Sequence, residues 1–163
     1  MTYTDVLERR RARPAQNLKT GAAMFLAYCG AAPLLAAALV VVREGGAAGA
    51  PAMAFMVAYG AALIIFFGGV RWGVAVMRPK GPTAGHLAGA VLPMLAALPL
   101  LTPGAETVKA MIIMALMVLL LADDLRATRR GDGAPEWYLG VRAPLTVLIE
   151  VAFLVALAAA ARG

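Results

Sequence analysis

The sequence predicts an all-α fold, a polytopic membrane protein built as a bundle of five transmembrane helices. Hydrophobic residues make up 62% of its 163 residues and charged residues only 15%, which is too apolar for a soluble domain of this size. The apolar residues form five runs of roughly 18 to 26 residues, and a helix needs roughly 20 to cross the hydrocarbon core of a bilayer. None of the runs alternates with period two, so each is expected to satisfy its backbone groups internally as a helix.

The first four runs are each followed by a stretch that contains glycine and proline, the residues that interrupt helices. These stretches are REGGAAGAP, RPKGPT, TPG and RRGDGAPEWY. Pro93 and Pro99 lie within the third run, where they remove backbone donors and predict a kink or a break. We therefore expect a basic arm at 1–20 and a single membrane domain at 21–163, with helices at about 21–42, 52–77, 84–101, 105–122 and 143–161.

The basic residues are distributed unevenly over the ends of the runs, which predicts the orientation of the chain. Lys and Arg near helix ends resist translocation, so the side richer in them stays in the cytoplasm. With a cytoplasmic N-terminus, Arg43, Lys109 and Arg162 lie outside, and the inner side collects Arg9, Arg10, Arg11, Arg13, Lys19, Arg71, Arg78, Lys80, Arg126, Arg129, Arg130 and Arg142. We expect a cytoplasmic N-terminus and an external C-terminus, in the inner membrane of a bacterium.

Two alternatives to this assignment follow from the same residues. The first run could belong to a secretory signal with RRRARP as its basic region, but its apolar part exceeds the roughly 7 to 15 residues of a signal core. The net charge of +6 could indicate a nucleic-acid partner, but the basic residues stand between apolar runs and are explained by topology. The expected partner is therefore the lipid bilayer, with a membrane-protein complex as a further candidate, and no nucleic acid is expected.

Ionisable residues inside or beside the apolar runs gather at one depth, on the predicted cytoplasmic side. Arg71 lies almost two turns, roughly 10 Å, before Arg78 along a helix. It either snorkels to the headgroups or pairs with a carboxylate. The candidate cluster consists of Arg71, His86, Asp123, Asp124, Arg142 and Glu150, of which Glu150 lies deepest. The cluster predicts either a small polar cavity open to the cytoplasm, as a ligand site, or structural ion pairs that join the helices.

Aromatic and small residues predict how the bundle sits in the membrane and how its helices pack. The predicted interfacial anchors, whose rings rest at the headgroup level, are Trp72, Trp137 and Tyr138. The last two could instead form a lid over the proposed cavity. The predicted packing glycines, spaced four apart so that backbones approach closely, are Gly69 with Gly73 and Gly85 with Gly89.

No catalytic residue, metal or cofactor is expected from the sequence. DDLRATRR opens like the aspartate-rich motif with which prenyl transferases hold Mg²⁺ and diphosphate, but Ala127 stands where the third carboxylate belongs. The single histidine, His86, has no evident partners for hydrolysis and leaves few metal ligands. The single cysteine, Cys29, cannot form an internal disulfide. An enzymatic activity is left open but is not expected.

Three stretches resemble a known family. GGVRWG (68–73), LADDLRATRRG (121–131) and PEWYLGVRAPLT (135–146) resemble the small membrane proteins grouped as domain of unknown function 3429, which are similar to transmembrane protein 69 of animal mitochondria. The resemblance covers most of the chain and implies no established activity. It picks out Arg71, Trp72, Asp123, Trp137, Tyr138, Arg142 and Thr146. Members often carry histidine in place of Arg71, which fits a hydrogen-bond donor or a cation at that position.

The predicted function is that of a non-enzymatic accessory or assembly factor, or a structural subunit, of a larger membrane complex. The alternative is a carrier or binder of a small lipophilic or anionic ligand, held by Arg71, Asp123 and Glu150 in a cytoplasm-facing polar cavity. An accessory factor should depend on its Gly- and Ala-rich lipid-facing surfaces, whereas a carrier should depend on its buried charges.

Overall fold

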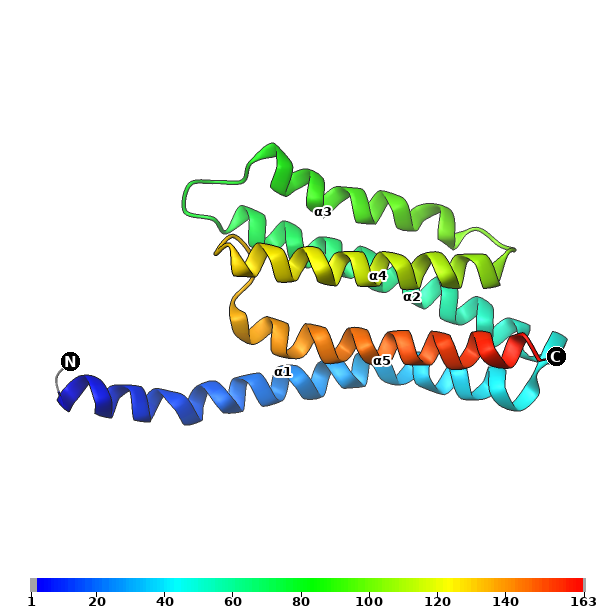
Figure 1. Cartoon of the computed structure of the whole chain (residues 1–163), viewed down its shortest axis with the longest axis horizontal. Helices are drawn as coiled ribbons and strands as arrows, with labels where there is room; N and C mark the ends of the chain where they lie inside the picture. Colours follow the sequence, from blue (N-terminus) through cyan, green and yellow to red (C-terminus); the bar gives the residue numbers. More distant parts are fainter. Residues whose placement is uncertain (1–2, 163) are drawn as a thin grey trace.

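The computed structural model describes the backbone of residues 3–162 and the side chains of residues 21–162. The described chain is all-α, as predicted, and its five long helices are joined by short connections (Figure 1). The elements are α1 (Tyr3–Glu44), α2 (Gly46–Val76), α3 (Ala84–Ala97), the 3₁₀ helix η1 (Leu98–Leu101), α4 (Glu106–Arg129) and α5 (Glu136–Ala160). Successive helices run in opposite directions along the molecule.

Two ends of the bundle can be distinguished by the connections that they hold (Figure 1). One end holds the α2–α3 and α4–α5 connections, and we term it the arginine-rich end because its basic residues are Arg78, Lys80, Arg126, Arg129 and Arg130. The opposite end holds the α1–α2 and α3–α4 connections. Its basic residues in the described chain are Arg43, Lys109 and Arg162.

Several helices extend beyond their predicted bounds. α1 already begins at Tyr3, so the backbone of the predicted basic arm continues the first helix. Only Gly45 separates α1 from α2, and both Gly45 (φ 61°) and Gly46 (φ 41°) adopt left-handed backbone angles that favour glycine. α4 continues through its acidic end to Arg129, and α5 begins at Glu136. The predicted loops were therefore too long, because glycine-rich stretches were read as breakers along their whole length.

The prolines of the third run act differently from one another. Pro93 lies inside α3, which continues through it to Ala97. The α-helix gives way to η1 at Leu98, directly before Pro99, which occupies the first turn of the 3₁₀ helix. Pro99 has no backbone N–H and cannot donate an α-helical hydrogen bond to the carbonyl oxygen of Leu95, which accepts instead from the N–H of Leu98.

Four helical segments of the described chain are long and apolar enough to cross a membrane. They are Gly21–Glu44, Gly46–Val76, Ala84–Leu101 and Glu136–Ala160. α4 is not among them, because its charged residues near both ends leave only 110–122 uncharged. At 1.5 Å per residue these 13 residues span roughly 20 Å, less than the hydrocarbon core.

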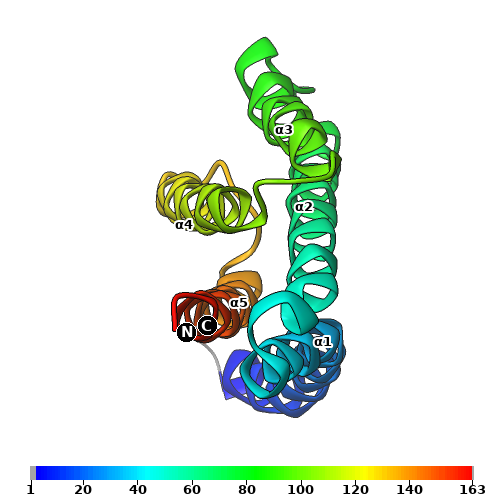
Figure 2. The same ribbon diagram turned by 90° about the vertical axis from the view of Figure 1, so that its right-hand side faces the viewer.

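α2 lies between α3 and α1 (Figure 2) and packs against both of them and against α4, while α5 packs against α1 and α4. Two glycines of α2 permit the closest approaches. A Cβ on Gly68 would lie 2.6 Å from Met94 Cγ of α3, and a Cβ on Gly60 would lie 2.9 Å from side-chain atoms of Ile113 and Phe153. The helices are therefore closely packed where α2 lacks side chains.

The predicted packing glycines are not the ones at these contacts. A Cβ on Gly69, Gly73 or Gly89 would meet nothing within 4 Å, and one on Gly85 would meet only Thr83 Oγ1 at 3.9 Å. Gly68 directly precedes Gly69 on α2, and residue spacing alone could not show which of the two faces a neighbouring helix. Within this chain, Gly60 and Gly68 mediate close packing, and contacts of the predicted glycines with another chain stay a prediction.

Candidate functional site

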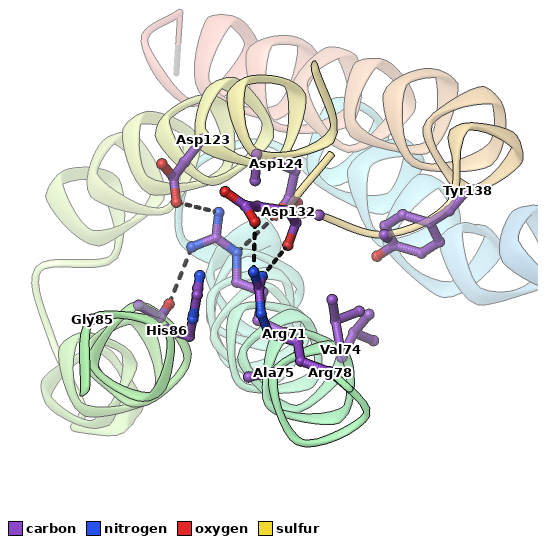
Figure 3. A pocket seen from close by; sticks show the side chains of 15 residues that line it. Arg71, Val74, Ala75, Arg78, Gly85, His86, Asp123, Asp124, Asp132 and Tyr138 are labelled. Atoms are coloured by element: carbon purple, nitrogen blue, oxygen red, sulfur yellow. Dashed lines mark hydrogen bonds and ion pairs between the residues drawn. The ribbon is translucent and has the colours of Figure 1, made fainter. Parts of the chain in front are cut away.

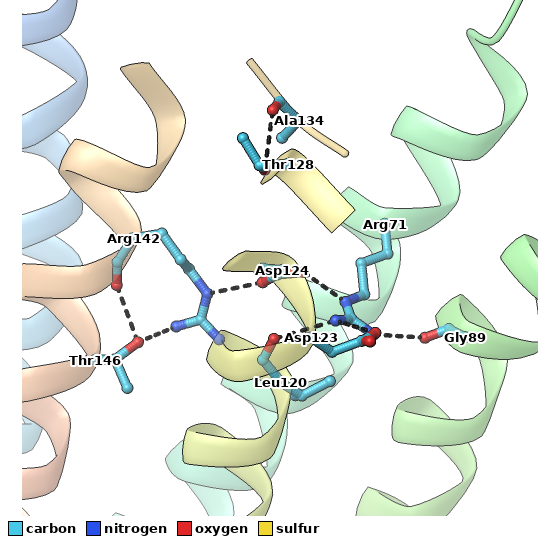
Figure 4. A network of polar contacts seen from close by, with 9 residues as sticks. All are labelled: Arg71, Gly89, Leu120, Asp123, Asp124, Thr128, Ala134, Arg142 and Thr146. Carbon is cyan, nitrogen blue, oxygen red and sulfur yellow. Dashed lines mark hydrogen bonds and ion pairs between the residues drawn. The ribbon is translucent and has the colours of Figure 1, made fainter. Parts of the chain in front are cut away.

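Arg71 joins three helices near the arginine-rich end (Figure 4). It projects from α2 and is mostly buried, and its Nε donates to Asp124 Oδ1 at 2.8 Å. Its Nη2 donates to Asp123 Oδ2 at 2.8 Å and to the carbonyl oxygen of Leu120 at 3.1 Å, both on α4. Its Nη1 donates to the carbonyl oxygen of Gly89 on α3, also at 3.1 Å. The sequence allowed Arg71 either to snorkel to the headgroups or to pair with a carboxylate. In the structure, Arg71 pairs with two carboxylates.

Asp124 is shared between two arginines. Its Oδ1 accepts from Arg71, and its Oδ2 lies 3.6 Å from Nε of Arg142, which projects from α5. Asp124 is mostly buried, with 14% of its side chain exposed, whereas Asp123 is 63% exposed. Asp124 therefore connects α2, α4 and α5, while Asp123 completes the pairing of Arg71 from the surface.

Arg142 is the largest fully buried side chain in the described part of the chain, with 1% of its surface exposed. Its Nη1 donates to the hydroxyl of Thr146 one turn later, and that hydroxyl donates to the carbonyl oxygen of Arg142 at 2.9 Å. Its guanidinium carbon lies 3.4 Å from the ring centroid of Phe67, a cation–π contact with α2. Its Nε and Nη2 have no hydrogen-bond partner among the described residues.

Together these residues form a neutral set, which we term the charge cluster: Arg71, Asp123, Asp124 and Arg142. Two cations and two carboxylates cancel, which lowers the cost of holding them in a low-dielectric environment. Removing a buried member of such a set, as Asp124 is, leaves an uncompensated buried charge and is strongly destabilising. The charge cluster can therefore hold helices in register, and it has little net charge to offer to a ligand.

A cavity of about 120 Å³ lies beside the charge cluster at the arginine-rich end (Figure 3). α2, α3, α4, the α4–α5 connection and the start of α5 all contribute to its walls. Its polar lining consists of Arg71, Arg78, His86, Asp123, Asp124, Asp132 and Tyr138. Small-molecule sites are usually about 300 to 1,000 Å³, so this cavity suits a few waters or a small ion better than a large ligand.

Arg78 and Asp132 form a second ion pair at this cavity. Arg78 Nη2 lies 2.5 Å from Asp132 Oδ1, and Arg78 Nη1 donates to the carbonyl oxygen of Asp132 at 2.7 Å. Hydrogen bonding to Arg78 and its positive charge lower the pKa of Asp132 below the ordinary value of 3.8. The pair fastens the end of α2 to the α4–α5 connection.

The two remaining residues of the predicted cluster lie differently. His86 lines the cavity, but its Nδ1 lies 2.8 Å from Thr83 Oγ1 and accepts from the Thr83 backbone N–H at 3.3 Å, so it completes a capping box at the start of α3. Glu150 forms no hydrogen bond or ion pair with the charge cluster in the described chain, and its buried Oε1 has no partner there. It lies two turns beyond Arg142 on α5.

The predicted anchors are found at the arginine-rich end. Trp72 and Trp137 are exposed, which is compatible with contact to headgroups. Tyr138 is half-buried, lines the cavity and makes an edge-to-face contact with Trp137 at a centroid distance of 6.2 Å. The carboxylates Asp123 and Asp124 face Arg71 and do not form an open metal site, and no three potential metal-ligating side chains cluster anywhere in residues 21–162.

Sequence reasoning missed several members of the site. The carbonyl groups of Gly89 and Leu120 carry no sequence signal, because any residue has a backbone carbonyl. Phe67 lies within an apolar run, where nothing in the sequence marks it as a partner of Arg142. The Arg78–Asp132 pair depends on the conformation of a connection. Thr146 was picked out by the family resemblance, and its position one turn after Arg142 would have indicated the contact.

The long apolar helices and the site between their ends define a multi-pass membrane protein. The chain belongs to the family described as Protein of unknown function (DUF3429), which matches residues 20–158 and confirms the resemblance. It is also similar to Transmembrane protein 69 of Xenopus tropicalis, with 34% identity over 130 residues. That match covers 77% of this chain and 49% of the relative, so the chain spans about half the relative's length. No solved structure matches the chain.

Proposed function

We propose that the protein is a five-span bundle of a bacterial inner membrane, with its N-terminus in the cytoplasm. The segregation of basic residues supports this orientation, because the arginine-rich end carries more of them than the opposite end. α4 is the fifth span in this proposal. Three of its charged side chains have partners within the chain. Asp123 and Asp124 bind Arg71, and Lys109 Nζ donates to the carbonyl oxygen of Thr102.

Within that membrane the protein acts as a non-enzymatic accessory, assembly or structural factor of a larger complex. The self-neutralised charge cluster carries this proposal. Arg71 already uses Nε, Nη1 and Nη2 in hydrogen bonds to its own chain, two of them to carboxylates, so its charge holds helices and is not offered to a ligand. The small outward residues Gly69 and Gly73 leave room for another helix to approach α2.

A carrier of a small anionic or lipophilic ligand is the second candidate. The cavity beside Arg71 supports it, together with the exposure of Asp123, because an anion could replace this carboxylate on Nη2. The small volume and the second carboxylate, Asp124, stand against it. The accessory role therefore fits the site better than the carrier role.

Mild extraction of the tagged protein from its own cells, followed by native size analysis and mass spectrometry of all bound species, tests the proposal. An accessory factor is recovered with subunits of one complex in fixed stoichiometry. Gly69→Leu with Gly73→Leu should then release those subunits, while Asp123→Asn should retain them. Recovery of the chain with a defined small molecule that Asp123→Asn alters, and without partner subunits, would instead establish the carrier.

A further inference from the structure

A second hollow, which we term the connection groove, lies between the end of α2 and the α4–α5 connection. Its volume is about 430 Å³, within the range of roughly 300 to 1,000 Å³ that is usual for small-molecule sites. The α2 side consists of Gly73, Val74 and Met77, and the connection side of Gly131, Gly133 and Pro135. The Arg78–Asp132 pair lines both this groove and the smaller cavity beside Arg71.

The groove is preformed, because its connection side is fixed by contacts with the end of α4. The backbone N–H of Asp132 donates to the carbonyl oxygen of Ala127 at 3.0 Å. The hydroxyl of Thr128 donates to the carbonyl oxygen of Ala134 at 3.2 Å. A Cβ on Gly133 would lie 2.5 Å from the backbone nitrogen of Thr128, so the connection packs directly on α4. A ligand that enters a preformed site orders little of the chain, which lowers the cost of binding.

The groove extends from the apolar surface of α2 to the polar connections. Gly73 lies in the last turn of α2, and a Cβ there would meet nothing within 4 Å, so this part of the groove is open. Trp72, directly before it, is exposed, as is typical of a ring at the headgroup level. Met77 is 83% exposed and directly precedes Arg78, where the charged connection begins. The groove therefore lies at the boundary between the acyl chains and the headgroups.

The chain around the groove carries an excess of positive charge. Residues 77–83 and 129–136 hold four basic and two acidic side chains, namely Arg78, Lys80, Arg129, Arg130, Asp132 and Glu136. Except for Arg78, all of them are exposed. Arg78 gives Nη1 and Nη2 to Asp132 (Figure 3), but a guanidinium has five N–H donors, so others remain for a ligand. The groove therefore attracts anions, and lipid phosphate is the anion that a membrane offers at this depth.

We propose that the connection groove binds the headgroup of one anionic phospholipid. Arg78 donates to the lipid phosphate, since a guanidinium forms strong, charge-assisted hydrogen bonds with phosphate oxygens. Lys80 and Arg130 supply the excess charge that favours a net-negative headgroup over a zwitterionic one. Val74 and Met77 contact the first carbons of the acyl chains. A free phosphate would meet the same cations but would leave this apolar side uncovered, so the intact lipid is the better ligand.

Native mass spectrometry of the purified full chain tests this proposal, with dioleoyl phosphatidylglycerol or dioleoyl phosphatidylethanolamine titrated in detergent. We expect one phosphatidylglycerol to bind roughly 10-fold more tightly than the zwitterionic lipid, because the exposed cations attract its net charge. Lys80→Gln with Arg130→Gln should remove most of this preference. Arg43→Gln with Arg162→Gln, the same loss of charge at the opposite end of the bundle, should leave it unchanged.

A matched pair of glycine variants tests the location without changing charge. Gly73→Leu should fill the groove and prevent the binding of phosphatidylglycerol. Gly69→Leu, one turn earlier on α2 and outside the groove, should leave binding unchanged, although a Cβ at either position meets nothing within 4 Å. Glycerol 3-phosphate, which has the phosphate but no acyl chains, should not displace the lipid.

Equal binding of the two lipids by the native chain would overturn the proposal. An equal loss of binding in Gly69→Leu and Gly73→Leu would also do so, as would displacement of the lipid by glycerol 3-phosphate. A photoreactive residue at position 77, activated in the native membrane, should label anionic phospholipid above its share of the bilayer. A protein adduct in its place would mean that another subunit covers the groove, which also contradicts the proposal. None of these outcomes depends on the accessory role, which is decided by co-purification.

Discussion

At the arginine-rich end, α2, α4 and α5 are joined by charged side chains, whereas halfway along the same helices they meet through glycine and apolar side chains. Arg71 and Arg142 approach Asp124 from two sides in the first region. In the second region, Gly60 lets Ile113 and Phe153 approach the backbone of α2. Charges fix direction and register but depend on a complete set of partners, whereas close packing depends on the absence of a Cβ.

The comparison predicts the largest effect at Asp124. Asp124→Leu should lower the free energy of unfolding by about 3 to 5 kcal/mol, because it leaves buried Arg142 without a carboxylate. Asp123→Leu is the matched control, and it should cost only about 0 to 1 kcal/mol, since Asp123 is mostly exposed. Unfolding measurements in bicelles distinguish the two variants. Equal losses would mean that burial does not separate the two carboxylates.

A glycine substitution examines the packed region. Gly68→Ala should lower the free energy of unfolding by about 1 to 3 kcal/mol, because its Cβ would overlap Met94 and approach the carbonyl oxygen of Ala90 at 2.8 Å. Gly69→Ala, one residue later, meets nothing within 4 Å and should be neutral or slightly stabilising. The same unfolding assay applies. A neutral Gly68→Ala would show that α3 moves freely on α2.

A hydrogen bond within the apolar region provides a smaller effect. Tyr59→Phe removes the donor to the carbonyl oxygen of Gly30, a polar link between α1 and α2, and should cost about 0.5 to 1.5 kcal/mol. Tyr28→Phe is the control, since that ring is exposed. Thermal unfolding of both variants in the same detergent measures the difference, and identical curves would contradict the assigned role of Tyr59.

The smallest effect concerns pH at the connection between α4 and α5. The Arg78 contact lowers the pKa of Asp132 below 3.8, so it stabilises the folded state above that pH and the contribution is lost as pH falls through the lower, folded-state pKa. Asp132→Asn should therefore be slightly less stable than the native chain at neutral pH and equal to it at strongly acidic pH. Melting temperatures recorded across the acidic range measure this. Curves that coincide across the whole range would show that the pair contributes nothing.

Much of the architecture was predictable from the sequence, because depth in a membrane follows from counting residues along each run. Arg71, Asp123 and Asp124 were placed at one level in this way, and they lie together. The direction of a side chain around its helix was not predictable, because core-facing and lipid-facing surfaces are both apolar. For that reason Glu150 was grouped with charges that it does not contact, and Gly69 was chosen where Gly68 makes the close approach.

A double-mutant cycle between Arg71 and Asp124 tests the central claim most directly, namely that the charge cluster joins helices and is not a ligand site. The free energies of unfolding of Arg71→Met, Asp124→Leu and the double variant would be compared with that of the native chain. We predict a coupling energy of about 1 to 3 kcal/mol, with the double variant less destabilised than the two single changes combined. A coupling energy near zero, with the native chain stabilised only when a ligand is present, would contradict the account.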